Sequence, residues 1–194
     1  MTLKTFSGRR ASQSEYELGE FVNLLQQHNV TRYLEIGARH GDTFHHVMTS
    51  LPPGSVGVAV DLPGGNWGTE KSRKALERVI ADLNARGYKT SSVFGDSRTS
   101  ATISIVARRG PYDAALIDGD HTYEGVASDF VNYGSLARLV AFHDIDGHGM
   151  RSNDEKSLEV EVPKFWKEIS AGRRCVEFIE RENPRPMGIG VLLP

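Results

Sequence analysis

The chain has 194 residues, of which 39% are hydrophobic and 25% are charged, as in ordinary globular domains. Its formal net charge of −2 offers no excess positive charge for nucleic acid or an anionic membrane, and no apolar run is long enough to span a bilayer. Cys175 is the only cysteine, which excludes an intrachain disulfide, and the first residues lack the apolar core of a secretory signal. We therefore expect one cytoplasmic domain over 1–194, with a loose leader at 1–11 and no nucleic-acid or membrane partner.

Helix and strand patterns alternate through the first part of the chain. Ser14 and Glu17 have the spacing of a helix-capping box, and apolar residues at helical spacing follow them. A glycine turn then leads into a helix that Asp42 or Thr43 is expected to cap. The expected elements are, in order, a helix over 14–28, a strand over 31–36, a helix over 42–50, a strand over 56–61, a helix over 70–86, a strand over 89–94 and a helix over 99–108.

The alternation continues until two strands follow one another near the end of the chain. The segment over 146–157 is polar and contains glycine, and we expect it to be mobile. The remaining expected elements are a strand over 113–117, a helix over 122–139, a strand over 139–143, a helix that buries Val162, Phe165, Trp166 and Ile169, and strands over 175–179 and 188–193. Alternating strands and helices predict an α/β fold with a seven-stranded, mostly parallel sheet, helices on both faces and a C-terminal antiparallel hairpin.

Five predicted strands end at or beside a carboxylate. These residues are Glu35, Asp61, Asp96, Asp118 and Asp144. The carboxyl ends of parallel strands share one edge, and open α/β sheets bind their ligands there. A row of acids suits a ligand with hydroxyls, amino groups and positive charge, whereas it would repel a pyrophosphate.

The first turn has two glycines in a GxxxG pattern, Gly37 and Gly41. Gly37 permits a sharp turn and the close approach of a ligand. Asp61, at the end of the next strand, could accept hydrogen bonds from both hydroxyls of a ribose. Arg39 stands where a dinucleotide fingerprint has its middle glycine, which weakens a dinucleotide interpretation. An ordinary strand–turn–helix with a surface acid is the simpler alternative.

Three segments together resemble the successive motifs of class I S-adenosylmethionine-dependent methyltransferases. They are the turn that begins at Glu35 and ends at Gly41, the strand end at Asp61, and Gly95-Asp96-Ser97. The resemblance covers nearly the whole chain and implies a Rossmann-like fold and S-adenosylmethionine as cofactor. The resemblance implies that Gly37 and Gly41 line the methionine part of the cofactor, and that Glu35 supports this turn or binds the amino group. It also implies that Asp61 holds the ribose hydroxyls, that Asp96 faces the adenine amino group and that Ser97 lies beside the ring.

The segment Asp-Gly-Asp-His-x-Tyr-Glu-Gly, which begins at Asp118, is similar to a subfamily with small-molecule oxygen acceptors. The resemblance implies O-methylation of a small-molecule hydroxyl, places Asp118 beside the cofactor, and points to a divalent metal in some relatives.

The residues themselves support a metal site. Asp118 and Asp144 end adjacent predicted strands, and with His143 and waters they would suit Mg²⁺ or Mn²⁺. Such an ion lowers the pKa of a bound hydroxyl, and His121 is the candidate base that takes its proton. His143 as a buried core histidine and Asp120 as a simple helix cap are the structural alternatives.

Other functions remain open from the sequence alone. A nicotinamide-dependent (NAD) oxidoreductase would also use the glycine turn and Asp61, and a non-catalytic domain would bind the cofactor without transferring methyl. A metal-dependent hydrolase could be built on His143, Asp144, Asp146 and His148. The acceptor pocket is expected to be formed by the leader, the 62–68 loop and the 146–157 segment, because loops carry specificity. The acceptor and a homo-oligomeric state are left open.

Overall fold

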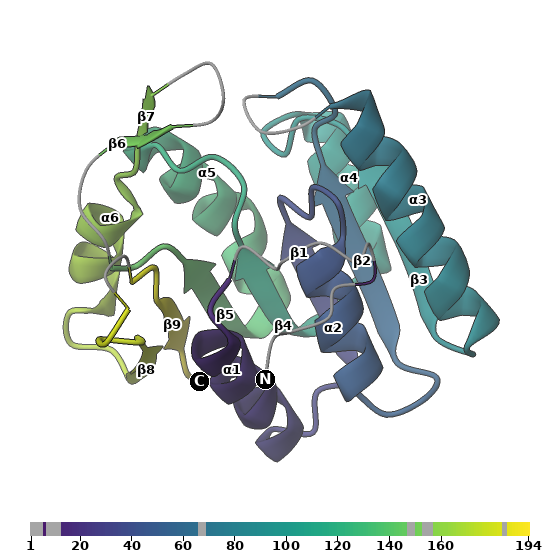
Figure 1. Cartoon of the computed structure of the whole chain (residues 1–194), viewed down its shortest axis with the longest axis horizontal. Helices are drawn as coiled ribbons and strands as arrows, with labels where there is room; N and C mark the ends of the chain where they lie inside the picture. The colour runs from purple at the N-terminus through teal and green to yellow at the C-terminus, as the bar shows by residue number, and fades with distance from the viewer. Residues whose placement is uncertain (1–5, 7–12, 66–68, 147–149, 153–156, 184–185) are drawn as a thin grey trace.

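The computed structural model describes residues 6, 13–65, 69–146, 150–152, 157–183 and 186–194. Its centre is a seven-stranded sheet with the strand order β3-β2-β1-β4-β5-β9-β8 (Figure 1). The strands are β1 Arg32–Ile36, β2 Val56–Asp61, β3 Lys89–Phe94, β4 Tyr112–Ile117, β5 Ala137–His143, β8 Cys175–Phe178 and β9 Ile189–Leu192. Neighbours among β1 to β5 pair in parallel, whereas β9 pairs antiparallel with both β5 and β8. The predicted fold class is therefore confirmed.

Helices cover both faces of the sheet. They are α1 Glu15–Gln27, α2 Asp42–Ser50, α3 Glu70–Ala85, α4 Ser100–Arg109, α5 Tyr123–Tyr133 and α6 Val162–Ser170. Apolar side chains of α1, α2 and α3 pack in one core cluster against one face, and those of α4, α5 and α6 pack in two clusters against the other. Consecutive residues of β1 alternate between these faces, since Tyr33 belongs to the first cluster and Leu34 to another. No helix in the described residues is long and apolar enough to cross a bilayer.

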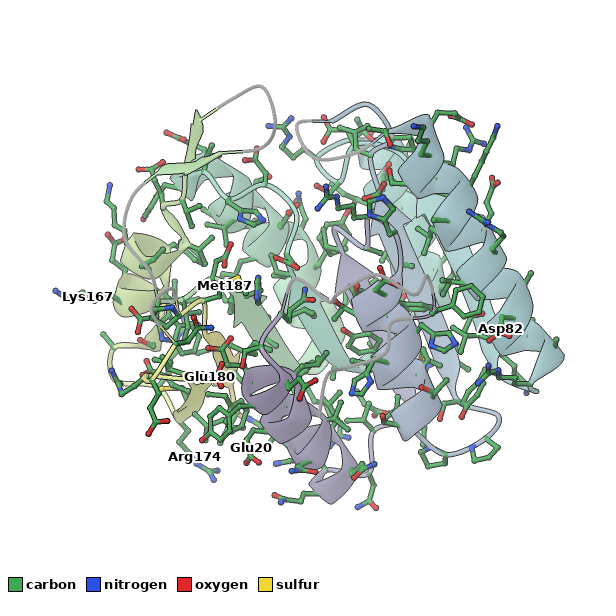
Figure 2. The ribbon with its side chains drawn as sticks, viewed as in Figure 1. Glu20, Asp82, Lys167, Arg174, Glu180 and Met187 are labelled. Atoms are coloured by element: carbon green, nitrogen blue, oxygen red, sulfur yellow. The ribbon has the colours of Figure 1, made fainter. Side chains whose placement is uncertain are left out.

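The start of α1 is tied to the far end of the chain. Ser14 caps α1 by accepting the backbone N–H of Glu17, as predicted. The buried Glu17 side chain does not complete the capping box but accepts the backbone N–H of Glu180, 3.0 Å away. The Ser14 hydroxyl donates to the Glu180 carboxylate, so α1 is fastened to the connection between β8 and β9 (Figure 2). The capping-box prediction was therefore right about Ser14 and wrong about Glu17.

Two local predictions were wrong, and one short pair of strands was not predicted. Gly41, with φ 81°, is the N-cap of α2, and neither Asp42 nor Thr43 caps it. The helix predicted over 122–139 ends at Tyr133, and a short 3₁₀ turn, η1 Gly134–Leu136, leads into β5. The helix ends before Gly134 because glycine is a poor helix former. Glycine is needed at this position because a side chain there would collide with the Phe130 ring. The polar segment over 146–157 contains strand β6 Met150–Ser152, which pairs antiparallel with β7 Ser157–Glu159.

Candidate functional site

The carboxylates predicted to share one edge do lie at the carboxyl ends of β1 to β5. Asp61 is the last residue of β2, and Asp118 and Asp144 directly follow β4 and β5. Glu35 lies one step inside the end of β1, where it pairs with Ala59 of β2 and Leu116 of β4. The strand order reverses between β1 and β4, so this edge contains the topological switch point at which open α/β sheets bind their ligands.

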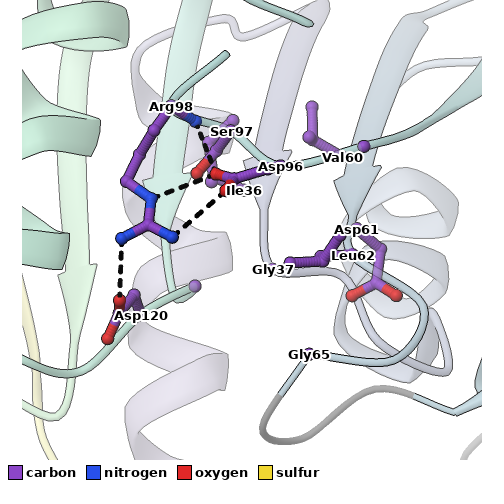
Figure 3. Close-up of a pocket in the computed structure, with 12 residues that line it drawn as sticks. Ile36, Gly37, Val60, Asp61, Leu62, Gly65, Asp96, Ser97, Arg98 and Asp120 are labelled. Carbon is purple, nitrogen blue, oxygen red and sulfur yellow. Dashed lines mark hydrogen bonds and ion pairs between the residues drawn. The ribbon is translucent and has the colours of Figure 1, made fainter.

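A cavity of about 270 Å³ opens at the switch point, between the ends of β1, β2, β3 and β4 (Figure 3). Ile36, Val60 and Leu62 give it apolar walls, and Asp61, Asp96, Ser97, Arg98 and Asp120 supply polar groups. Gly37, Gly65, Gly95 and Gly119 complete the lining. Four predicted cofactor residues therefore line one cavity, namely Gly37, Asp61, Asp96 and Ser97, whereas Glu35, Gly41 and Asp118 are not part of its described lining.

The two carboxylate oxygens of Asp61 differ in their hydrogen bonding. Its Oδ1 accepts the backbone N–H of Arg39 at 2.9 Å, while Oδ2 is buried and has no hydrogen bond of good geometry with a described residue. The side chain is only 6% exposed, and this burial raises the pKa of Asp61, although Arg39 and the backbone N–H of Leu62 counter the rise. A buried acceptor without a good hydrogen bond is costly, so a ligand hydroxyl at Oδ2 would relieve that cost.

Arg98 bridges two walls of the cavity, and sequence reasoning missed it. Its guanidinium binds both oxygens of Asp96, each at 3.1 Å, and lies 3.8 Å from the Asp120 carboxylate on the next loop (Figure 3). The hydrogen bonds from Arg98 lower the pKa of Asp96. The edge is therefore less negative than a row of uncompensated acids. The available signal was the arginine two residues after Asp96.

The two glycines of the first turn have packing reasons that require no ligand. A Cβ on Gly37, which has φ 91°, would lie 2.1 Å from the backbone oxygen of Asp118. The same atom on Gly41 would lie 2.8 Å from the Leu76 side chain of α3. Both positions need glycine for conformation and space. Gly37 also borders the cavity, and Gly41 starts α2 beside it.

Glu35 is buried and bound by its own strand. The Tyr33 hydroxyl donates to Glu35 Oε2 at 2.8 Å. Burial raises the pKa of Glu35 to about 8, although the bond from Tyr33 opposes that shift. Glu35 is therefore mostly protonated at neutral pH. It contributes little negative charge to the carboxyl edge of the sheet, where the sequence predicted a row of acids.

Replacing Glu35 with glutamine should raise stability at alkaline pH and change it little in acid. Because the pKa of Glu35 is about 4.5 in the unfolded chain and about 8 in the folded protein, the folded state holds one more proton than the unfolded state between these pH values. The free energy of unfolding therefore falls as the pH rises through that window. Glutamine stays neutral and can still accept the Tyr33 hydroxyl. Urea unfolding should show Glu35→Gln to be more stable than the unaltered protein by a few kcal/mol at about pH 8.5, and equal at about pH 4.5. If the free energies of unfolding of the two proteins change in parallel with pH, the pKa of Glu35 is not raised in the folded protein.

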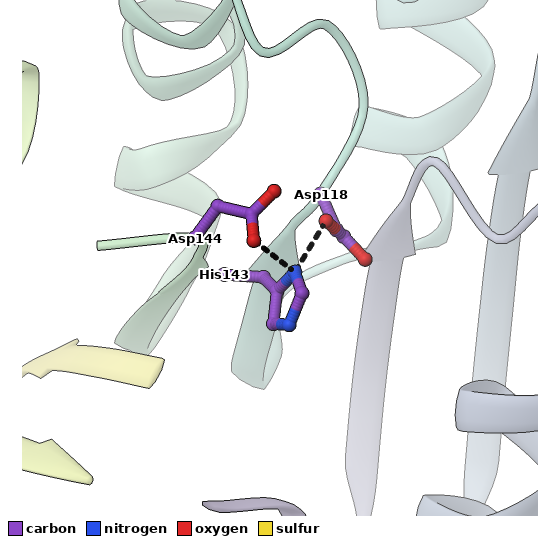
Figure 4. Close-up of side chains that lie close together, drawn as sticks. All are labelled: Asp118, His143 and Asp144. Carbon is purple, nitrogen blue, oxygen red and sulfur yellow. Dashed lines mark hydrogen bonds and ion pairs between the residues drawn. The ribbon is translucent and has the colours of Figure 1, made fainter. Parts of the chain in front are cut away.

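A second polar cluster lies beside the cavity, at the ends of β4 and β5. The ligand atoms of Asp118, His143 and Asp144 all lie within 4.8 Å of one another (Figure 4). His143 Nδ1 is 3.1 Å from Asp118 Oδ1 and 3.4 Å from Asp144 Oδ1. Asp144 is fully buried, and its φ of 64° is unusual for a residue other than glycine. Such strained backbone occurs often at functional sites, and here it accompanies a buried carboxylate in this cluster.

His121 joins this cluster from the turn before α5. Its Nδ1 is 2.8 Å from Asp144 Oδ2, and its Nε2 is 3.5 Å from Asp118 Oδ1. Burial alone would lower the pKa of His121, but the hydrogen bond with Asp144 and the charge of Asp118 raise it above its usual value. Gln13, just before α1, also reaches the cluster, since its Nε2 donates to Asp118 Oδ2 at 3.4 Å. The structure thus brings together every predicted catalytic and metal residue.

Some predicted participants fall in segments that the structure does not describe. His148, part of the hydrolase alternative, lies outside the described residues, as do most of the leader and part of the 62–68 loop.

Asp120 does not cap α5 itself. Thr122 is the N-cap, and Asp120 accepts the Thr122 backbone N–H at 3.1 Å.

Comparisons with known proteins indicate a family and a fold. A family model described as a methyltransferase domain matches residues 34–145. An O-methyltransferase from Bacillus cereus, solved in complex with SAH, is 18% identical with a TM-score of 0.68, over 93% of this chain and 82% of that one. An O-methyltransferase of tomaymycin synthesis from Streptomyces achromogenes, solved with SAM, is 17% identical with a TM-score of 0.66, over 97% and 83% of the two chains. At these identities the likeness shows the fold alone. A search of curated protein sequences gave no significant match.

Proposed function

Because the family model spans more than half of the chain, this protein belongs to the methyltransferase domain family, and we propose that it transfers a methyl group from S-adenosylmethionine to a hydroxyl of a small molecule. The observation that carries the proposal is the Asp61 carboxylate, which lines the switch-point cavity with one buried oxygen that lacks a hydrogen bond of good geometry. The cluster of His121, Asp118 and Asp144 lies next to that cavity, where an acceptor would meet the cofactor.

The residues around the cavity fit a nucleoside with an amino-acid tail. Asp61 would accept both ribose hydroxyls, and the apolar walls formed by Ile36, Val60 and Leu62 would flank the adenine ring. Asp96 and Ser97 would lie at the adenine edge. The turn from Glu35 to Gly41, which Gly37 holds against the β4 loop, would take the methionine part. When bound, the cofactor supplies an electrophilic methyl group.

Asp118, His143 and Asp144 have a donor set that fits a divalent cation. Two carboxylates and an imidazole suit Mn²⁺ and accommodate Mg²⁺ when waters complete the shell. A cation held there would lower the pKa of an acceptor hydroxyl. Asp144, as the most buried of the three, would be its best-fixed ligand.

His121 is placed to remove the acceptor proton. Its contact with Asp144 favours the tautomer with the proton on Nδ1, which leaves Nε2 as the acceptor on the side of Asp118. Asp144 would orient the ring and stabilise the imidazolium that forms when Nε2 takes the proton. His121 therefore acts as the general base.

The dinucleotide alternative has no support in the cavity. Among the described residues, the polar lining of the cavity comprises three carboxylates, one hydroxyl and one guanidinium, which Asp96 already binds. A pyrophosphate would meet net negative charge there.

Replacing Asp61 with alanine tests the cofactor assignment. Loss of the charge-assisted hydrogen bonds to ribose should weaken S-adenosylhomocysteine binding by about 1–3 kcal/mol, or about 5- to 150-fold in Kd. Isothermal titration calorimetry measures this directly, with thermal unfolding of both proteins as the control for folding. Unchanged affinity would remove Asp61 from the ribose role. If the unaltered protein binds NAD⁺ and gives no heat with S-adenosylhomocysteine, the proposed function is wrong.

A further inference from the structure

Asp129 of α5 is a buried carboxylate directly behind the cavity wall. Its exposed fraction is 1%, and neither oxygen has a hydrogen bond of good geometry with a described residue. A Cβ on Gly119, which lines the cavity, would lie 3.0 Å from Asp129 Oδ2. Nothing in the sequence motifs assigns this residue a role, and a buried carboxylate without good hydrogen bonds needs an explanation.

Asp129 faces the loop that carries the predicted adenine contacts. The Ser97 side chain lies close enough to favour the ionised carboxylate and thereby lowers the pKa of Asp129. Tyr133, one helical turn further along α5, donates its hydroxyl to the backbone oxygen of Ser97 at 2.5 Å. Two side chains on one face of α5 therefore act on Ser97, one near its hydroxyl and the other at its carbonyl.

The charge on Asp129 is sensitive to pH in the physiological range. Burial raises its pKa to about 6, and the Asp120 and Asp96 charges act in the same direction, whereas Ser97 and the Arg98 guanidinium oppose it. These groups come from the two loops that form the cavity wall, and Tyr133 is the titratable neighbour on α5 itself. Protonation of Asp129 removes the negative charge that attracts the Ser97 hydroxyl.

We propose that Asp129 is a positioning residue: its ionised carboxylate holds Ser97 and the adenine-side loop in the binding conformation, so that cofactor affinity falls when Asp129 is protonated. This inference rests on the proposed function, because it assumes that the cavity holds the adenosyl group. Asp129 itself touches no part of the cofactor and acts through Ser97.

The test is the Kd of S-adenosylhomocysteine for the unaltered protein and for Asp129→Asn, measured by calorimetry at a series of pH values. Asparagine resembles the neutral acid, so the variant should bind about 3- to 10-fold more weakly at about pH 7.5. The ratio of the two Kd values should fall towards 1 at about pH 5, where the unaltered Asp129 is also protonated. Asp61 and the other acids titrate in both proteins, so their effects cancel in this ratio.

Two further variants keep the outcome clear. Glu124→Gln removes an exposed carboxylate from the same helix and should leave the Kd unchanged at every pH. If Asp129→Asn does not fold, Ser97→Ala removes the hydroxyl that Asp129 attracts. Binding by that variant should be weaker at every pH and should lose the fall in affinity that Asp129 protonation causes between about pH 7.5 and pH 5. Equal affinities, or a ratio that does not change with pH, would overturn the role of Asp129 while the proposed function stands. Failure of the unaltered protein to bind S-adenosylhomocysteine would overturn both.

Discussion

Replacing His121 with asparagine is expected to lower kcat by about 10²- to 10⁴-fold, which is the usual contribution of a general base. Affinity for S-adenosylhomocysteine should stay unchanged, because His121 lies in the cluster with Asp118 and Asp144 and does not line the described cavity. The measurement is transfer of labelled methyl from S-adenosylmethionine to whichever hydroxyl acceptor the unaltered protein uses best.

His45 offers a matched control for this experiment. It also pairs with an aspartate, since its Nε2 lies 3.0 Å from Asp82 Oδ2, but the pair joins α2 to α3 away from the cavity. Figure 2 shows Asp82 on α3. His45→Asn should therefore leave kcat unchanged. A His121→Asn variant with undiminished kcat would show that the proton leaves by another route.

Replacing Asp144 with asparagine should weaken metal binding and disturb the orientation of His121. The change keeps the shape of the side chain but deletes a fully buried charge that contacts both histidines of the cluster. Loss of an anionic oxygen ligand should weaken Mn²⁺ binding by about 10- to 100-fold, and kcat should fall at least as far. Calorimetric titration with Mn²⁺ and methyl-transfer rates in the presence and absence of a chelator measure the two effects.

Asp146→Asn is the control for this substitution. Asp146 belongs to the same segment and to the predicted hydrolase alternative, but it is not part of the Asp118, His143 and Asp144 cluster. Its replacement should leave Mn²⁺ binding intact. If a chelator has no effect on the unaltered protein and Mn²⁺ gives no heat, the cluster is a hydrogen-bonded structural group and the metal assignment fails.

Sequence reasoning located the strands and their terminal acids well. Apolar runs bounded by glycine, proline and polar residues are local signals, and β2 and β3 begin and end where they were predicted. Parallel strands share a carboxyl edge, so the convergence of Asp118, His143 and Asp144 followed from topology. These features depend on a few neighbouring residues and one general rule of α/β folds.

The remaining features depend on contacts between distant segments. Arg98 bridges two loops, and its pairing with Asp120 requires β3 and β4 to be in place. Glu35 appears acidic in the sequence, yet burial raises its pKa to about 8 and leaves it mostly uncharged at neutral pH. Asp129 looks like an ordinary helix residue until α5 packs behind Ser97 and Gly119. Burial and partner identity are tertiary properties, and no local pattern specifies them.

The most direct test of the central claim is a crystal structure of the protein with S-adenosylhomocysteine and Mn²⁺. We predict that the ribose hydroxyls will meet Asp61 Oδ2 in the switch-point cavity, and that the ion will be bound by Asp118, His143 and Asp144. A nucleoside bound elsewhere, with Asp61 Oδ2 still lacking a good hydrogen bond, would contradict the account.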